Sequence, residues 1–431
     1  HDRAQAWGAA CAVTCIGDLN AAIVGGHGAG LVAQDEAKTD GRIAAVARSI
    51  AARTGVRLVL IAGPSASGKT TFAAKLSLAL QVAGVAALPL STDDYYRCPD
   101  EPDYPRTSSG APDHEVPEAL RLHDLNDHLL KLAAGEEVET PIFDMVAQKP
   151  KAKGRMMRLP RGGVLVMEGI FCLNPDLTQR IAPEHKFRIF IAPISQVRFD
   201  DLEWLSHRTL RLLRRISRDF LHRGRSASST LGKWDSVRRG EELNILPNLE
   251  GVDYSFNSSS TYELAVLKVH CMPLLETVSP DDPMFQTAQE LMSFLTAVQP
   301  LSDKWIPPTA ILREFVGGSE FEVTARRHAV APPPDPGSRP LPYQMASNFP
   351  EVQTMAEFLP AKDIIASAVG GQIMSLRSPL PGLTSDVQPV HVESAEGIAV
   401  YRATLRFLLS MACKRLYPTR AVRVWHAAGA E

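Results

Sequence analysis

The sequence lacks several features that would place it in a common class. Its formal net charge is only −2, which predicts neither nucleic-acid binding nor attachment to a charged membrane surface. Its apolar runs have the length of strands and fall well short of the roughly 20 residues that a membrane-spanning helix requires. The composition is otherwise ordinary for a globular protein, and 431 residues suffice for two or three domains.

Cysteine is scarce and scattered. The chain has no Cys-x-x-Cys pair and no histidine partner at zinc spacing; its cysteines are Cys11, Cys15, Cys98, Cys172, Cys271 and Cys413. Cys11 and Cys15 lie close together, but no second pair completes a metal site. His114, His123 and His128 also lack a partner set and are interpreted as surface or helix histidines. The thiols indicate a reducing compartment, so a cytoplasmic location is expected.

One stretch carries a specific chemical signature. An apolar run with the character of a buried parallel strand begins at Leu58 and ends before Gly63. Gly63-x4-Gly68-Lys69-Thr70 then matches the phosphate-loop pattern, and a helix is expected to follow. Backbone N–H groups in such a loop bind phosphates, Lys69 would reach the β- and γ-phosphates, and the Thr70 hydroxyl would hold Mg²⁺. The candidate ATP-binding residues of the loop are Gly63, Ser65, Ala66, Ser67, Gly68, Lys69, Thr70 and Thr71.

Strand and helix patterns alternate around this loop. Further strands are expected over residues 84–90, 163–169 and 186–192, and a helix starting at Pro117 is expected to end at Gly135. A helix from residue 40 leads into the first strand, whereas the glycine-rich residues 25–30 are interpreted as a turn. Alternating strands and helices indicate an α/β fold with a doubly wound parallel sheet.

Acidic and basic clusters follow the expected strands. Asp93 and Asp94 come directly after the second strand, and Glu168 ends the third, where open α/β sheets place their chemistry. The expected helix over residues 208–225 is rich in arginine, and we interpret it as a lid on transferred phosphates. Its arginines are Arg208, Arg211, Arg214, Arg215, Arg218, Arg223 and Arg225.

The motifs that are missing narrow the choice among phosphate-loop proteins. The chain has no Asn-Lys-x-Asp motif for reading guanine, and its third strand ends in a single Glu168 rather than in the Asp-Glu pair of ATPase motors. A phosphate loop with an acidic base and an Arg-rich lid is instead typical of small-molecule kinases. The sequence alone does not distinguish Asp93 from Asp94 as the base.

These pieces together resemble the uridine kinase and phosphoribulokinase family of P-loop kinases. The resemblance covers about residues 57–275 and rests on several motifs in register, at residues 63–71, 91–97, 116–120, 132–141, 166–171 and 214–225. It implies a P-loop NTPase fold with an Arg-rich helical lid and small α+β flanking segments. It also implies transfer of the γ-phosphate of ATP to the 5′-hydroxyl of a pyrimidine nucleoside, in pyrimidine salvage.

The resemblance also implies roles for single residues. Asp93 takes the position of the general base, and Thr70 and Glu168 take the Mg²⁺ positions. Arg218 and Arg223 match lid arginines on the phosphates. The positions on the substrate side are Tyr96, Asp113, Glu115, Phe143, Gln148, Arg215 and Arg225.

The sequence departs from the family pattern in the pocket for the base. Where uridine-cytidine kinases read Pro-x-Tyr-Asp-Phe-x-x-His-x-Arg, this chain has Phe143, Met145, Gln148 and Pro150 for Tyr, Phe, His and Arg. Gln148 still offers a donor and an acceptor to a pyrimidine edge. Two alternatives therefore stay open: a kinase of another sugar-like alcohol, and a nucleotide-sensing or RNA-associated protein without turnover. No membrane or nucleic-acid partner is expected for the kinase, and a homo-oligomer stays open.

The flanks resemble a longer subfamily in which the kinase is fused to ubiquitin-like and editing-like domains of threonyl-tRNA synthetase. Motifs at residues 232–241, 256–258 and 311–319 carry this resemblance. The expected domains are the end of a synthetase-like leader (1–40), the kinase with a helical extension (41–325), a Pro-rich linker (326–345), and the start of a synthetase-like domain (346–431). Because the two ends resemble successive parts of one leader, we expect a piece of a tandem-repeat protein.

Overall fold

A parallel sheet forms the centre of the molecule. The computed structural model describes residues 7–198 and 206–321, together with three strands between residues 364 and 391. The main sheet has five strands in the order β2-β7-β1-β8-β9, and every neighbouring pair is parallel. Its strands are β1 (Leu58–Ala62), β2 (Ala87–Ser91), β7 (Val164–Gly169), β8 (Lys186–Ala192) and β9 (Tyr254–Asn257).

Strand β1 shows why the sequence folds this way. All five of its residues are buried, because helices cover both faces of the sheet. Val59 and Ile61 belong to one apolar core, whereas Leu58 and Leu60 belong to the core on the opposite face. The continuous apolar run therefore reflects burial on two sides, and the expected α/β doubly wound architecture is confirmed.

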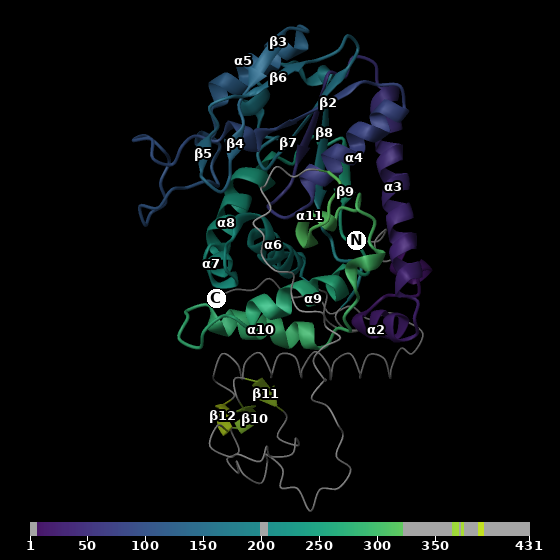
Figure 1. The fold of residues 1–431 in the computed structure, drawn as a ribbon, viewed down its shortest axis with the longest axis vertical. Helices are drawn as coiled ribbons and strands as arrows, with labels where there is room; N and C mark the ends of the chain where they lie inside the picture. Colours follow the sequence, from purple (N-terminus) through teal and green to yellow (C-terminus); the bar gives the residue numbers. More distant parts are fainter. Residues whose placement is uncertain (1–6, 199–205, 322–363, 370–371, 375–386, 392–431) are drawn as a thin grey trace, which may run out of the picture.

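The two faces carry different helices. The core that includes Val59 and Ile61 also takes residues from α3 (Gly28–Ala52), α4 (Lys69–Val82), α6 (His207–Arg223) and α9 (Glu263–Leu275). The opposite core takes residues from α5 (Leu122–Ala133). Figure 1 shows α3 running beside α4 along one side of the sheet.

The amino-terminal helices belong to the same core as the sheet. Helix α2 (Ile16–Val24) ends at Gly25, and α3 starts at Gly28, so the glycine-rich turn is shorter than expected. The boundary expected at residue 40 falls inside α3, which is continuous. Leu31 and Val32 before it, and Ile43 after it, are buried in one core with the strands.

The helix expected from Pro117 starts later than its sequence pattern suggested. Pro117–Ala119 forms a 3-10 turn (η2), and Leu120 then adopts an extended backbone with φ −98° and ψ 153°. Leu120 pairs with Tyr96 in an antiparallel bridge, which pulls the chain out of the helix until α5 begins at Leu122. The bridge joins the acidic segment that follows β2 to the residues just before α5.

Short elements complete the described part. Two antiparallel pairs, β3 (Glu137–Thr140) with β6 (Arg155–Arg158) and β4 (Phe143–Asp144) with β5 (Lys149–Pro150), lie between α5 and β7. The remaining elements are η1 (Thr92–Tyr95), η3 (Pro175–Thr178), η4 (Pro183–His185), α7 (Ala227–Gly232), α8 (Trp234–Gly240), the π-helical η5 (Glu241–Ile245), η6 (Leu246–Asn248), α10 (Phe285–Thr296), η7 (Asp303–Trp305) and α11 (Arg313–Val316). No helix among the described residues is long and apolar enough to cross a bilayer.

The domains predicted at the carboxyl-terminal end can be followed only in part. The linker expected at 326–345 lies outside the described residues, as does most of 346–431. Within the latter range, β10 (Ile364–Val369) pairs antiparallel with β11 (Gln372–Met374) and with β12 (Val387–His391).

Candidate active site

The phosphate loop connects β1 to α4 and comes very close to its neighbours. A Cβ on Gly63 would lie 2.1 Å from the carbonyl oxygen of Ile191 in β8, so no larger residue fits there. Ala66 and Gly68 have positive φ angles, 61° and 86°, which turn the chain into the helix. Gly68 is the N-cap of α4 and has no side chain to cap the helix. The first N–H groups of α4 therefore receive no capping bond from the residue that starts the helix.

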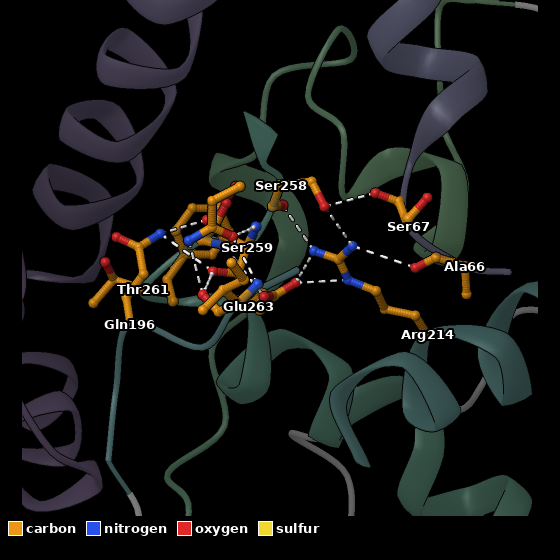
Figure 2. A network of polar contacts seen from close by, with 12 residues as sticks. Ala66, Ser67, Gln196, Arg214, Ser258, Ser259, Thr261 and Glu263 are labelled. Atoms are coloured by element: carbon orange, nitrogen blue, oxygen red, sulfur yellow. Dashed lines mark hydrogen bonds and ion pairs between the residues drawn. The ribbon is translucent and has the colours of Figure 1, made fainter. Parts of the chain in front are cut away.

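Arg214 fastens this loop to the rest of the protein (Figure 2). Its guanidinium donates to the Glu263 carboxylate at 2.9 Å, to the Ser258 carbonyl at 2.9 Å and to the Ala66 carbonyl at 3.4 Å. Ser258 Oγ donates in turn to the Ser67 carbonyl at 2.6 Å. Arg214 and Glu263 are almost completely buried. This arginine of the expected lid helix therefore holds the loop in shape.

Two neighbouring arginines of α6 donate hydrogen bonds to the same loop. Arg211 donates to the Ser65 carbonyl at 3.0 Å and pairs with Glu241 at 2.7 Å. Arg215 donates to Ser65 Oγ at 2.7 Å. Both side chains are buried, so α6 is packed into the protein and not laid loosely over it.

Lys69, Thr70 and Glu168 meet at the carboxyl ends of β1 and β7. Thr70 Oγ1 lies 3.4 Å from Glu168 Oε1, and Ser91 Oγ donates to the same oxygen at 2.6 Å. Burial, followed by the charge of Asp93, raises the pKa of Glu168 to about 7, and Lys69 opposes this shift. Burial lowers the pKa of Lys69, whose ammonium donates to the Pro64 carbonyl at 3.2 Å.

This oxygen-rich cluster suits a magnesium ion. Mg²⁺ prefers oxygen ligands and commonly uses one or two carboxylates together with substrate phosphates. Thr70, Ser91 and Glu168 supply two hydroxyls and a carboxylate at one point. Within residues 7–198 and 206–321, no group of three or more histidines, cysteines and carboxylates forms an all-protein cage. The donor set therefore fits an ion that arrives with phosphates.

The two adjacent aspartates have different surroundings. Asp94 accepts a hydrogen bond from the backbone N–H of Phe143 at 3.1 Å and so ties η1 to β4. Burial is the main reason that the pKa of Asp94 is raised. Asp93 lies close enough to Lys69 and Glu168 for its charge to affect the pKa of both. The structure thus gives Asp94 a bracing contact and leaves Asp93 beside the phosphate loop.

On the expected substrate side, Tyr96 and Phe143 form an aromatic pair. The rings of Tyr96 and Phe143 are 5.9 Å apart at 52°, and both side chains are buried. The Tyr96 hydroxyl donates to the carbonyl of His114 at 3.1 Å. Burial, then the charges of Asp93 and Glu115, raises the pKa of Tyr96 well above its usual value.

The other substrate-side residues are more spread out. Asp113 accepts from the Glu115 N–H at 3.0 Å and pairs with Arg239 at 3.3 Å. Burial raises the pKa of Glu115, whereas Arg215 acts in the opposite direction. Gln148 has a left-handed backbone with φ 54° and precedes β5 in the β4–β5 hairpin. Among the residues described, its side chain makes no hydrogen bond to the protein, so the structure does not join it to the Tyr96–Phe143 pair.

Asp219 pairs with three arginines of α6. Arg218 donates to its carboxylate at 2.8 Å, and Arg215 and Arg223 lie at 3.4 Å from it. Asp219 is 1% exposed, and despite its burial these arginines hold its pKa below the usual value. The backbone N–H of Arg225 donates to the Asp219 carbonyl at 3.1 Å. Three guanidiniums on one carboxylate leave an excess of positive charge beside the phosphate loop.

Several residues of the site were missed by the sequence interpretation. Ser91 and Asp219 lie within the motifs at residues 91–97 and 214–225, but a serine at the end of a strand and a lone acid among arginines do not reveal their contacts. Glu263 and Glu314 lie far from the loop in sequence but contact Arg214 and Thr71, respectively. The motif at residues 311–319 was the only signal that pointed toward Glu314.

Comparisons with known proteins agree with this geometry. The family model described as "Phosphoribulokinase / Uridine kinase family" matches residues 58–265. The uridine kinase of Proteus mirabilis is 30% identical over 185 residues, which cover 42% of this chain and 77% of that protein. The chain belongs to the phosphoribulokinase/uridine kinase family. It is therefore a kinase, a phosphotransferase with an alcohol group as acceptor, and the family implies ATP as its substrate.

Other proteins that match this chain are more distant. The uridine kinase of Halobacterium salinarum is 28% identical over 194 residues, covering 45% of this chain and 76% of that protein. A putative fructose transport system kinase from Silicibacter, among solved structures, is 19% identical with a TM-score of 0.38, covering 50% of this chain and 98% of its own. The fold assignment rests on the sheet order and the family match.

Proposed function

We propose that this kinase transfers the γ-phosphate of ATP to the 5′-hydroxyl of a pyrimidine nucleoside, uridine or cytidine, in pyrimidine salvage. The observation that carries the proposal is the position of Asp93, which follows β2 between two groups of residues. On one side are Lys69 and Glu168, whose pKa values it affects. On the other is Tyr96, which packs against Phe143. A general base is needed at such a junction of donor and acceptor.

The donor half would be built on the phosphate loop. The backbone N–H groups from Gly63 to Thr71 would bind the phosphates of ATP, with Lys69 on the β- and γ-phosphates. Thr70 and Glu168 would hold Mg²⁺, which neutralises phosphate charge when bound. The positive excess around Asp219 supports binding of transferred phosphate by Arg218 and Arg223.

The chemical step would need one proton acceptor. Asp93 would take the proton of the 5′-hydroxyl as its oxygen bonds to the γ-phosphorus, and the bond from that phosphorus to the β–γ bridging oxygen would break. ADP leaves with the bridging electrons, and the phosphate ester stays on the nucleoside. Asp94 is bound to the Phe143 N–H, which favours Asp93 for this role.

The acceptor half would use the remaining predicted residues. Tyr96 and Phe143 offer aromatic faces for the sugar and the base, and Asp113 and Glu115 offer carboxylates to the ribose hydroxyls. Arg215 and Arg225 would lie nearer the substrate than Arg218. Gln148 would read the base edge from its hairpin if nucleoside binding brings the hairpin in.

The relatives support a nucleoside, because several named members that match this chain are uridine kinases. The cytoplasm is proposed as the location because the five described cysteines are free thiols. The alternative acceptor is another sugar-like alcohol, favoured by the changed residues Phe143 and Gln148. A nucleotide-sensing protein without turnover is a second alternative, against which the complete set of Lys69, Thr70, Asp93 and Glu168 argues.

A transfer screen tests the proposal. The full chain is incubated with ATP labelled on its γ-phosphate and with single nucleosides or sugar alcohols, and labelled products are separated. Uridine or cytidine should give the highest kcat/KM, and Asp93→Asn should lower product formation by at least about 100-fold. A sugar alcohol as the best acceptor would favour the first alternative, and no transfer to any acceptor would favour the second.

A further inference from the structure

The motif at residues 311–319 lies against the phosphate loop, far from its place in the sequence. Helix α11 (Arg313–Val316) packs beside α6, and the Ser217 hydroxyl donates to the Phe315 carbonyl at 2.8 Å. A Cβ on Gly68 would lie 2.4 Å from Ile311 Cγ2. The glycine that leads into α4 therefore also allows this segment to approach.

Glu314 points from this segment at the start of α4. Its Oε2 accepts from the Thr71 backbone N–H at 3.1 Å and from Thr71 Oγ1 at 3.0 Å. Thr71 is the third residue of α4, and its N–H is one of the first-turn donors that have no partner within the helix. Because Gly68 has no capping side chain, a carboxylate from 243 residues away takes this donor.

The same donors are where a phosphate would bind. The first N–H groups of a helix, together with its dipole, form an anion site, and phosphate loops use them for nucleotide phosphates. Here an anion of the protein itself is already present. Thr71 is 0% exposed and Glu314 is 6% exposed, so no open path leads to this N–H while the contact exists.

The charges around Glu314 are those that a nucleotide would use. Its carboxylate is close enough to Lys69 and Arg218 to act on the pKa of both. Each of these cations is a predicted phosphate ligand. A negative side chain among them, bound to a helix N-terminus, imitates part of a bound nucleotide.

We infer that Glu314 competes with the donor nucleotide for the start of α4, so that ATP must displace this carboxylate from Thr71 to bind fully. The inference rests on the proposed function for the identity of the nucleotide, though not for the contact itself. In the absence of nucleotide, residues 311–316 cap the phosphate loop. Nucleotide binding would release them, and the contact therefore lowers the affinity for ATP.

Binding measurements on Glu314→Gln test the inference, because glutamine keeps the size and one acceptor but removes the charge. Affinity for a non-hydrolysable ATP analogue is measured by titration calorimetry on the full chain. The variant should bind about tenfold more tightly, the effect of one charge-assisted contact at a helix N-terminus. Glu320→Gln is the matched control and should leave the affinity unchanged, since Glu320 is exposed just after this segment.

A second measurement separates competition from a permanent cap. Hydrogen exchange of residues 311–316 should become faster when the analogue binds the unmodified protein. Unchanged exchange, together with unchanged or weaker affinity in Glu314→Gln, would overturn the inference and make Glu314 a structural cap. The affinity comparison is valid when the melting temperature of the variant lies within a few degrees of that of the parent. A second variant, Ile311→Ala, loosens the same contact without altering charge and should also bind the analogue more tightly.

The inference and the proposed function can fail separately. Tighter nucleotide binding in Glu314→Gln without transfer to any nucleoside would support the inference and contradict the proposed acceptor. If the parent and Glu314→Gln both phosphorylate uridine and bind ATP with the same affinity, the proposed function is supported and the inference is contradicted.

Discussion

The donor and acceptor halves of the site are built in different ways. Around the phosphate loop, buried polar groups from three distant parts of the chain converge, as Arg214 joins Ala66, Ser258 and Glu263. Around the expected acceptor, the β4–β5 hairpin pairs only two residues on each strand. Buried polar networks fix one geometry, whereas a short hairpin leaves side chains such as Gln148 free to vary. The difference explains why the donor side can be assigned in detail and the acceptor only by class.

The largest expected effect separates the two adjacent aspartates at the boundary of the halves. Asp93→Asn should lower kcat by about 100-fold to 10,000-fold, the usual contribution of a general base, and should leave ATP affinity within about twofold. Steady-state kinetics and calorimetry measure the two quantities.

Asp94→Asn is the matched comparison. It weakens the contact to the Phe143 N–H and should raise the KM for the acceptor while most of kcat is kept. If Asp94→Asn lost as much kcat as Asp93→Asn, the assignment of the base would be wrong.

The next effect concerns the stability of the donor half. Arg214→Ala leaves the buried Glu263 carboxylate without its partner and should lower the free energy of unfolding by about 3–5 kcal/mol. Urea unfolding followed by circular dichroism measures this. Arg208→Ala removes an exposed pair with Glu242 and should cost less than about 1 kcal/mol. Equal losses in both variants would mean that burial does not distinguish these pairs.

A smaller effect depends on pH through Glu168. Its pKa of about 7 is raised from 4.5, so the folded protein holds this proton more tightly than the unfolded chain does. The resulting stability is present below pH 4.5 and is lost as the pH rises through about 7. Relative to the parent, Glu168→Gln should therefore melt higher at pH 8 than at pH 5, in thermal scans without metal. A difference that does not change with pH would contradict this.

The same carboxyl should make metal binding pH-dependent. Mg²⁺ needs the ionised form, so the Mg²⁺ concentration required for half-maximal activity should increase as the pH falls below about 7. As a control, Glu168→Gln should lose this pH dependence and should also lose most of the activity.

The smallest effect tests the acceptor half. Gln148→His introduces the residue that the uridine-cytidine kinase pattern has at this position and should change kcat/KM for uridine by a few-fold, without changing the KM for ATP. Competition between uridine and cytidine in one reaction measures the preference. A change in ATP affinity would place Gln148 on the donor side instead.

The sequence predicts the donor half of the site better than the acceptor half. The strand, the loop and the helix after it were predictable because their chemistry requires fixed residues at fixed spacing, whereas the metal-binding roles of Thr70 and Glu168 stay predictions. The roles of Arg211 and Arg214 were not predictable, because an arginine-rich helix has the same pattern whether its guanidiniums face solvent or a buried carboxylate. The sequence pattern predicts that helix α3 starts at residue 40, because its first turns are rich in glycine and charge. Only their burial against the sheet shows that these turns are part of the helix.

That continuous helix has a consequence for what counts as the cooperative folding unit. Asp35 and Glu36 accept hydrogen bonds from the Thr261 N–H and the Tyr262 hydroxyl, in the loop that follows β9. A protein trimmed to the family-matched residues 58–265 would lack the acceptors of this N–H and this hydroxyl and would uncover the face of α4 that α3 covers. We therefore expect the unit that unfolds cooperatively to be larger than the family-matched segment and to include α3.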